Sequence, residues 1–200
     1  MIAIFDYGAG NLRSVENTLD AIGAEYEIVR DSDGLRRADK IILPGVGHFG
    51  QLIRSLDELG VREAFCERIA AGVPFLGICL GLHALFEKSE EAPELRGFGV
   101  FPGSVKRFPR DARVPHMGWN ELEIRGAPRL LGQLEPKPYV YFAHSYYVPE
   151  EAAGDRAAAL CEYEVRYAAA IEAGNVFGVQ FHPEKSGAIG QRIMRNFLAC

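Results

Sequence analysis

The chain has 200 residues, of which 48% are hydrophobic, and a chain of this kind can bury a sizeable core in one domain, expected over residues 1–200. The net charge of -5 gives no basic surface for nucleic acid. No apolar run approaches the roughly 18 residues of a membrane helix, and an apolar strand-like stretch follows Met1 directly, so we expect a cytoplasmic protein without a membrane partner. The four cysteines are widely spaced without a CxxC pair, which argues against a zinc site or disulfide framework.

The N-terminal half alternates short apolar stretches with helical patterns. Strands are expected over residues 2–6, 25–30 and 40–43. The first helix is marked by apolar residues at helical spacing, Leu12, Val15, Leu19 and Ile22, with Asn11 as N-cap and Gly23 as stop. Gly8 and Gly10 suggest a dinucleotide-binding GxGxxG turn, but Arg13 occupies the third glycine position, so we expect no dinucleotide cofactor.

The segment Pro-Gly-Val-Gly-His-Phe-Gly over residues 44–50 places three glycines at the end of the third strand. Glycine lets the N–H groups of a loop converge on one point, so Val46 and Gly47 are candidates for one wall of an oxyanion site. The alternative is a plain turn before a helix. Apolar residues from Leu52 to Ile69 then predict one broken helix that closes at Gly72.

Residues 73–86, VPFLGICLGLHALF, predict a buried strand over residues 74–78 and a helix that includes Leu80, Leu82, Leu85 and Phe86. Cys79 lies at the junction, between Gly77 and Gly81. A tight strand-to-helix turn strains its central residue and leaves no room for bulk two residues away, so this pattern is typical of a nucleophile elbow. The new helix directs free N–H groups at the sulfur, and Leu80 offers one to an oxyanion. The alternative is a buried structural cysteine.

The C-terminal half changes character after a polar stretch over residues 87–96. Short strand patterns cover residues 99–108, 119–124, 139–148, 157–163 and 168–172, which predicts an antiparallel or mixed sheet. A turn at Gly174 leads into a strand over residues 176–181, and an amphipathic helix is expected over residues 191–198. The fold class is therefore α/β, with a central largely parallel sheet, flanking helices and an antiparallel or mixed extension.

A cysteine nucleophile needs a base and a group that orients the base. His182 follows the last strand, and Glu184 lies two residues on, within reach of the imidazole across Pro183. Taken alone, this pattern also suits two surface polar residues at a strand end. His83 is the rival base, one helical turn beyond Cys79 and one before Glu87, so Cys79, His83 and Glu87 could line one helix face as a rival triad. We discount it, because His83 would lie beneath the sulfur rather than beside its target. The remaining histidines, His48, His116 and His144, line a pocket or make structural hydrogen bonds.

These residues resemble the class I glutamine amidotransferases, whose triad is Cys, His and Glu. GICLG and FHPE mark the wider family, and PHMGWN narrows the resemblance to glutaminase subunits of imidazole glycerol phosphate synthase. The resemblance runs nearly end to end through FDYGAGN (5–11), PGVGHFG (44–50), GICLG (77–81), PHMGWN (115–120), YFAHSYY (141–147) and QFHPEKS (180–186).

The resemblance implies that Cys79 attacks glutamine, that His182 and Glu184 complete the triad, and that ammonia passes to a (β/α)8-barrel cyclase partner in a heterodimer. It implies no cofactor and no metal. Ser145 and Tyr146 match positions that hold the glutamine backbone. Asn11, Trp119, Tyr141 and Lys185 match positions at the subunit face or tunnel entrance. His83 stands where the family usually has a substrate-contacting glutamine, so it either replaces that contact or loses it.

Two other classes remain open at this point. Another glutaminase, such as that of pyridoxal phosphate synthase, or a cysteine peptidase of similar fold would share the elbow, although PHMGWN argues against both. In a non-catalytic flavodoxin-like binding module, GICLG would only pack a helix against a strand.

Overall fold

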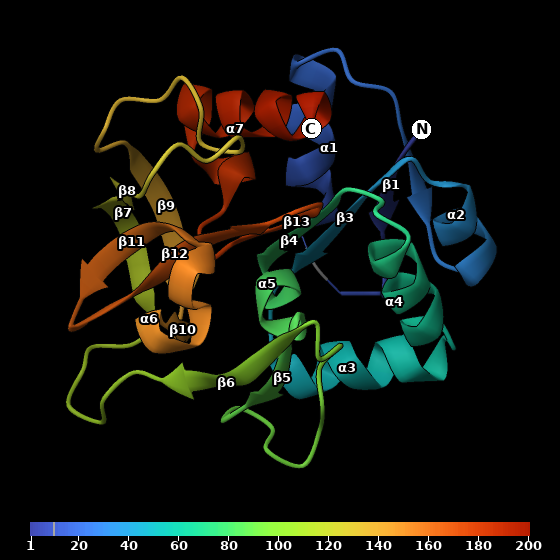
Figure 1. Ribbon diagram of the computed structural model, residues 1–200. Helices are drawn as coiled ribbons and strands as arrows, with labels where there is room; N and C mark the ends of the chain where they lie inside the picture. Colours follow the sequence, from blue (N-terminus) through green and yellow to red (C-terminus); the bar gives the residue numbers. More distant parts are fainter. Residues whose placement is uncertain (10) are drawn as a thin grey trace.

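The computed structural model describes residues 1–9 and 11–200, so Gly10, the second glycine of the GxG pattern, lies outside the described residues. A single eleven-stranded sheet crosses the molecule over the described ranges, in the order β2-β1-β3-β4-β13-β12-β10-β6-β5, with β11 paired to β12 and β8 paired to β11 (Figure 1). A separate two-stranded sheet pairs β7 with β9.

The strands are β1 (Ile2–Phe5), β2 (Tyr26–Val29), β3 (Lys40–Gly45), β4 (Phe75–Cys79), β5 (Phe86–Ser89), β6 (Phe101–Arg107), β7 (His116–Glu121), β8 (Glu123–Ile124), β9 (Tyr139–His144), β10 (Tyr146–Pro149), β11 (Ala157–Tyr163), β12 (Val165–Ala173) and β13 (Val176–Val179). The α-helices are α1 (Leu12–Ala21), α2 (Ser32–Arg37), α3 (Phe49–Glu58), α4 (Arg62–Ala70), α5 (Leu80–Ala84), α6 (Glu150–Ala153) and α7 (Gly187–Ala199), and the 3-10 helices are η1 (Gly154–Arg156) and η2 (Pro183–Lys185).

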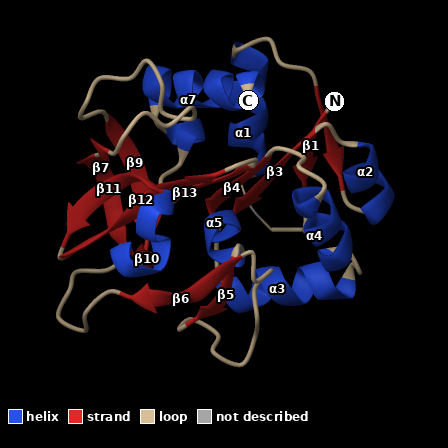
Figure 2. Cartoon of the chain, viewed as in Figure 1, coloured by secondary structure: helices blue, strands red, loops and turns tan. Residues whose placement is uncertain are grey.

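The parallel region of the sheet has helices on both faces, as Figure 2 shows: α1 and α7 lie above it, and α3, α4 and α5 below it. Successive strand residues point to opposite faces, so Ile41 joins the core beneath the sheet while Ile42 joins the core above it. Strands covered on both faces are buried throughout, which explains the continuous apolar run of β4. The expected α/β architecture is confirmed.

The extension is mixed, as expected. β12 is antiparallel to both β13 and β10, and β6 is antiparallel to β10 but parallel to β5. Two predicted strands are each divided in the structure. Residues 119–124 contribute to β7 and β8, which pair with β9 and β11 respectively, and residues 139–148 divide at Ser145 into β9 and β10.

The helix after Cys79 is shorter than expected. It ends at Ala84, and Leu85 and Phe86 lie beyond it, with Phe86 opening β5. The reason is a later segment of the chain, because the N–H of Phe98 donates to Ala84 O at 2.6 Å and that of Phe101 to Leu85 O at 3.0 Å. These donors occupy the carbonyls at the helix end and draw Phe86 into a strand. The polar stretch over residues 87–96 therefore begins as β5.

Three other expectations need smaller corrections. Asn11 occupies the N-cap position of α1, but its side chain makes no capping hydrogen bond. The broken helix is two helices, α3 and α4, separated at Gly60. The closing helix begins at Gly187, four residues before the expected start at Gln191.

Candidate active site

The site is built on a strained turn between β4 and α5. Cys79 has φ 54° and ψ −103°, a conformation that costs a residue with a Cβ atom free energy. A Cβ on Gly77 would collide with the backbone of Gly81, and a Cβ on Gly81 would collide with the carbonyl oxygen of Leu43. The two glycines are therefore required by close backbone approach, and the predicted strained elbow is confirmed.

The predicted base and its orienting carboxylate are in contact. His182 Nδ1 lies 2.7 Å from Glu184 Oε1, and both side chains are almost fully buried. The contact is not made along an extended chain as expected, because Pro183 begins the 3-10 turn η2 immediately after His182. The backbone N–H of His182 donates to Tyr141 O at 2.9 Å, and its carbonyl accepts from Ser186 Oγ at 2.7 Å, so the imidazole is anchored from both sides.

The protonation of His182 follows from its surroundings. Burial alone lowers the pKa of His182, but hydrogen bonds and charge interactions with Cys79 and Glu184 outweigh it and raise the pKa to about 10. Because this raised pKa lies well above neutral pH, whereas the usual histidine pKa is near 6.5, the imidazolium form persists at neutral pH. The site can therefore hold a proton ready for a leaving group.

A cavity of about 380 Å³ opens over the elbow. It brings together ten of the thirteen predicted site residues: Asn11, Val46, Gly47, Cys79, Leu80, His83, Ser145, Tyr146, His182 and Lys185. Glu184 lies behind His182 rather than in the lining, and Trp119 and Tyr141 lie outside it. Glu91 also lines the cavity and was not predicted. Its Oε2 accepts the N–H of Phe49 at 2.8 Å, at the start of α3.

The loop after β3 is held by a residue that the sequence did not indicate. The hydroxyl of Tyr7 lies 3.3 Å from both the N and the O of Val46, and Tyr7 is buried. Burial is the main reason that the pKa of Tyr7 rises to about 12, so the phenol is neutral. The Val46 N–H therefore already has a partner in this conformation, whereas Gly47 has φ 99° and lines the cavity.

His83 does not assemble the rival triad. Its Nε2 lies 2.8 Å from Gln180 Oε1, and burial lowers its pKa to about 4, so the ring is neutral. Glu87 belongs to β5 rather than to a helix face shared with Cys79, and its carboxylate lies 3.6 Å from the guanidinium of Arg96. A substrate contact by His83 stays a prediction.

The other three histidines make structural hydrogen bonds. His48 Nδ1 accepts the N–H of Gly50 at 3.0 Å at the start of α3. His116 and His144 flank the buried hydroxyl of Tyr167, at 3.2 Å from His116 Nδ1 and 3.1 Å from His144 Nε2. His144 Nδ1 lies 2.8 Å from Tyr146 O and therefore donates to it, which leaves Nε2 to accept from the Tyr167 hydroxyl.

The far end of this chain of hydrogen bonds is at His116 and Asn120. The Tyr167 oxygen accepts from His116 Nδ1–H, and His116 Nε2 faces the Asn120 amide at 3.4 Å. Burial lowers the pKa of His116 to about 4 and the pKa of His144 well below its usual value, so both rings are neutral. The hydrogen bonds tie β7 to the cavity wall at Tyr146.

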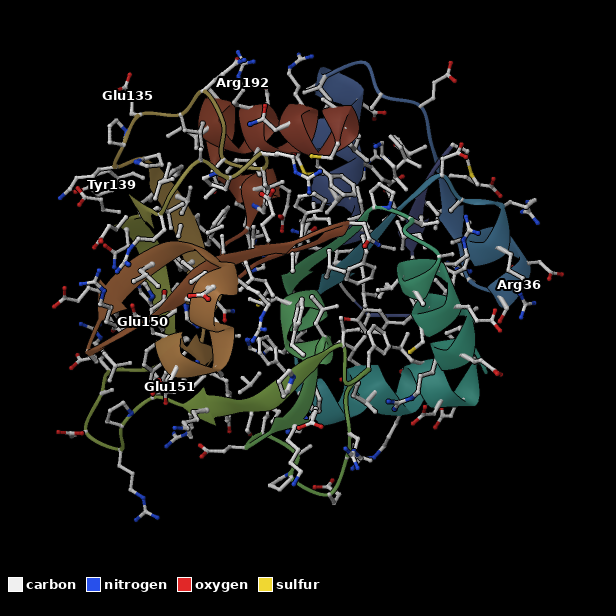
Figure 3. All side chains as sticks on the ribbon, in the orientation of Figure 1. Arg36, Glu135, Tyr139, Glu150, Glu151 and Arg192 are labelled. Carbon is white, nitrogen blue, oxygen red and sulfur yellow. The ribbon has the colours of Figure 1, made fainter. Side chains whose placement is uncertain are left out.

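Aromatic side chains gather on the β7–β9 sheet. Trp119 is 56% exposed and meets Tyr141 edge to face at a ring separation of 6.2 Å, and Lys185 Nζ lies 5.6 Å from the centre of the Tyr141 ring. Met117 and Tyr139 are also exposed, and Tyr139 projects outward from β9 in Figure 3. Because Lys185 also lines the cavity, this exposed surface adjoins the mouth of the site.

The described residues contain neither a candidate metal site nor a candidate membrane-spanning helix. No group of three His, Cys, Asp or Glu side chains in the described ranges is placed to hold a metal ion. Among the described helices, none combines the length and apolar character needed to cross a membrane.

Comparison with known proteins agrees with this geometry. The family "Glutamine amidotransferase class-I" matches residues 3–200. The chain is 47% identical over 198 residues to the imidazole glycerol phosphate synthase subunit HisH of Methanothermobacter thermautotrophicus, covering 99% of this chain and 98% of that protein. The corresponding subunit of Bacillus mycoides is 44% identical, with 98% and 93% covered.

Solved structures show the same fold at lower identity. A crystal structure of a glutamine amidotransferase superposes with a TM-score of 0.78 at 22% identity, covering 99% of this chain and 97% of that one. With the strained cysteine elbow, the buried His182–Glu184 pair and the end-to-end similarity to HisH subunits, the chain belongs to the class I glutamine amidotransferase family.

Proposed function

We propose that the chain is the glutaminase subunit of imidazole glycerol phosphate synthase. It hydrolyses glutamine to glutamate and ammonia and passes the ammonia to a (β/α)8-barrel cyclase subunit, which makes imidazole glycerol phosphate and AICAR in histidine biosynthesis. The observation that carries the proposal is the meeting of Cys79 with the buried His182–Glu184 pair at one cavity. The choice of imidazole glycerol phosphate synthase over other amidotransferase assemblies rests on the relatives named HisH, which are 42–47% identical to this chain.

The proposed reaction uses the triad in two steps. Cys79 Sγ attacks the side-chain amide carbon of glutamine, the C–N bond breaks, and His182 gives its proton to the departing ammonia. Water then loses a proton to His182 and attacks the thioester, the C–S bond breaks, and glutamate is released with the thiolate and the imidazolium restored. Glu184 keeps the imidazole in the orientation that serves both transfers, since its Oε1 lies 2.7 Å from Nδ1.

The oxyanion formed in each step needs donors that are already aimed at it. Leu80 supplies the N–H that begins α5, next to the strained Cys79. Val46 and Gly47 supply the other wall of the oxyanion site. Ser145 and Tyr146 hold the α-amino and carboxylate groups of glutamine, with His83 as a further substrate contact in the same cavity.

The partner binds over the exposed surface formed by Trp119, Tyr141 and Lys185, with Asn11 at the same cavity edge. Ammonia released at Cys79 then leaves the site without meeting bulk water. The protein works as a single amidotransferase domain over residues 1–200 in a cytoplasmic heterodimer. It uses no cofactor and binds neither nucleic acid nor membrane.

The decisive experiment compares two ammonia sources. In the complex, Cys79→Ala abolishes the glutamine-dependent synthase reaction and leaves the reaction with added ammonia intact, because the elbow glycines and not the sulfur shape the turn. Loss of both reactions in a well-folded complex contradicts this division of labour. A glutamine-like diazoketone adds mass to Cys79 of a glutaminase and leaves a cysteine peptidase or a binding module unmodified.

The partner also switches the site on. A free glutaminase wastes glutamine, and one misdirected N–H at Val46 removes about 2.7–4 kcal/mol of transition-state stabilisation, roughly 10²–10³ in turnover. The assay measures glutamine hydrolysis by the isolated chain, then with the barrel subunit, then with that subunit and a ligand resembling its substrate. Equal turnover in the three conditions contradicts the switch.

A further inference from the structure

Gln180 is the most deeply buried polar side chain beside Cys79 that the proposed reaction does not use. It follows β13 and is 0% exposed. β13 runs parallel to β4 with Val179 opposite Ile78, so Gln180 comes directly alongside Cys79. Its backbone N–H donates to Ala169 O at 2.8 Å, so only the side-chain amide of Gln180 is directed at the site.

The two ends of that amide have different partners. Gln180 Nε2 lies 3.6 Å from Cys79 Sγ, within the reach of a hydrogen bond to sulfur, and Gln180 Oε1 lies 2.8 Å from His83 Nε2. An amide nitrogen only donates and an amide oxygen only accepts. The sulfur therefore receives an N–H from Gln180, and His83 Nε2 must carry the proton that Oε1 accepts.

The proton on His83 decides which end of the amide faces the sulfur. His83 Nδ1 is buried and has no partner among the described residues, and a buried ring nitrogen is tolerated more readily as an unpaired acceptor than as an unpaired N–H. The neutral ring thus carries its proton on Nε2. With the proton on Nδ1, the amide would turn, and its carbonyl oxygen would face the sulfur and repel negative charge there.

We propose that Gln180 donates a hydrogen bond to the Cys79 thiolate of the reacting enzyme, and that His83 is a positioning residue that holds the Gln180 amide in the donating orientation. The role of this pair in turnover rests on the glutaminase function proposed above. A hydrogen bond to a charged acceptor is stronger than one to a neutral group, so the contact favours thiolate over thiol.

The first test measures the thiolate directly. The isolated chain is treated with iodoacetamide over pH 5–9, and the peptide containing Cys79 is followed by mass spectrometry, so that Cys66, Cys161 and Cys200 do not contribute. Gln180→Met keeps the length of the side chain and removes both polar atoms. We expect its alkylation midpoint to rise by about one pH unit, which lowers the rate below the midpoint roughly tenfold. Gln191→Met on α7, outside the cavity lining, makes the same substitution as a control and leaves the profile unchanged.

The second test separates His83 from a purely structural role. His83→Gln keeps a donor for Gln180 Oε1, so its profile follows the unmodified chain. His83→Leu removes the donor and frees the amide to turn, so its midpoint rises, by less than in Gln180→Met. In the complex, Gln180→Met lowers kcat for glutamine more than it changes KM for glutamine, because Gln180 contacts the sulfur and not the substrate.

An unchanged alkylation profile in folded Gln180→Met overturns the proposal. If that variant does not fold, the His83 pair decides, and identical profiles for His83→Leu and His83→Gln overturn it. Alkylation needs no glutamine turnover, so the two proposals fail separately. A shifted profile in a protein that never hydrolyses glutamine keeps the Gln180 contact and refutes the glutaminase.

Discussion

The strained backbone at Cys79 should make a glycine variant more stable than an alanine variant at this position, the reverse of the usual order. Glycine in place of alanine ordinarily destabilises a regular element by about 0.5–1 kcal/mol, because glycine loses more backbone freedom on folding. Cys79→Ala keeps the Cβ, and with it the strain of φ 54° and ψ −103°, whereas Cys79→Gly removes both. We therefore expect Cys79→Gly to be the more stable of the two variants.

The size of the difference follows from three contributions. Strain of this kind costs about 1–3 kcal/mol, and ψ −103° lies outside the left-handed helical basin, so the upper end of that range applies. Two contributions favour Cys79→Ala instead. Glycine loses more backbone entropy on folding, about 0.5–1 kcal/mol, and alanine buries one methyl group, about 0.8 kcal/mol. The net is about 1 kcal/mol in favour of Cys79→Gly.

Urea unfolding of the two variants measures this difference. With a slope of about 2–3 kcal/mol/M, 1 kcal/mol moves the midpoint by about 0.3–0.5 M. The exposed Ala70 near the end of α4 provides the control, since Ala70→Gly should show the ordinary loss of stability. If Cys79→Ala proves more stable than Cys79→Gly by the margin seen at Ala70, the elbow stores no strain.

The remaining predictions concern the triad, acid stability and the oxyanion loop. Glu184→Gln should lower kcat for glutamine less than His182→Ala, which removes the proton carrier and costs roughly 10²–10⁴; equal losses, or no loss in Glu184→Gln, contradict an orienting role. Because the pKa of His83 is lowered to about 4 in the fold, the free energy of unfolding should be highest above pH 6.5 and should fall by up to about 3 kcal/mol as the pH drops toward 4. The raised pKa of His182 causes no change in the free energy of unfolding below pH 6.5. The lowered pKa values of His116 and His144 contribute a loss in the same direction as that of His83. Urea unfolding between pH 6.5 and 5 checks the share of His83, since His83→Gln should reduce the slope without abolishing it; a slope that His83→Gln leaves unchanged contradicts it. Tyr7→Phe releases the Val46 peptide and should raise glutamine hydrolysis by the isolated chain, with roughly 10²–10³ as the ceiling; unchanged turnover contradicts a hold by Tyr7.

The elbow was predictable from the sequence because its constraints are local. A turn this tight excludes side chains at Gly77 and Gly81, so the residues themselves record the backbone path. The His182–Glu184 contact was also predictable, since two residues of chain separate the partners, although the 3-10 turn that joins them was not.

Tyr7 and Gln180 were not predictable because their partners come from distant segments of the chain. Tyr7 meets a peptide 39 positions away, and Gln180 meets a sulfur 101 positions away. A tyrosine or a glutamine alone does not indicate a catalytic site in a sequence. The early end of α5 has the same origin, since the donors that occupy its last carbonyls belong to Phe98 and Phe101.

The hydrogen-bond chain through Tyr167 has a consequence for the chemistry of the cavity wall. The carbonyl of Tyr146 is taken by His144, and the carbonyl of Ser145 accepts the N–H of Phe108 at 3.2 Å. Both carbonyls therefore already accept a hydrogen bond from within the protein. A negatively charged group bound beside these two residues would therefore meet fewer backbone acceptors, with Lys185 as a cationic side chain in the same cavity. This arrangement depends on His116 and His144 remaining uncharged in the core.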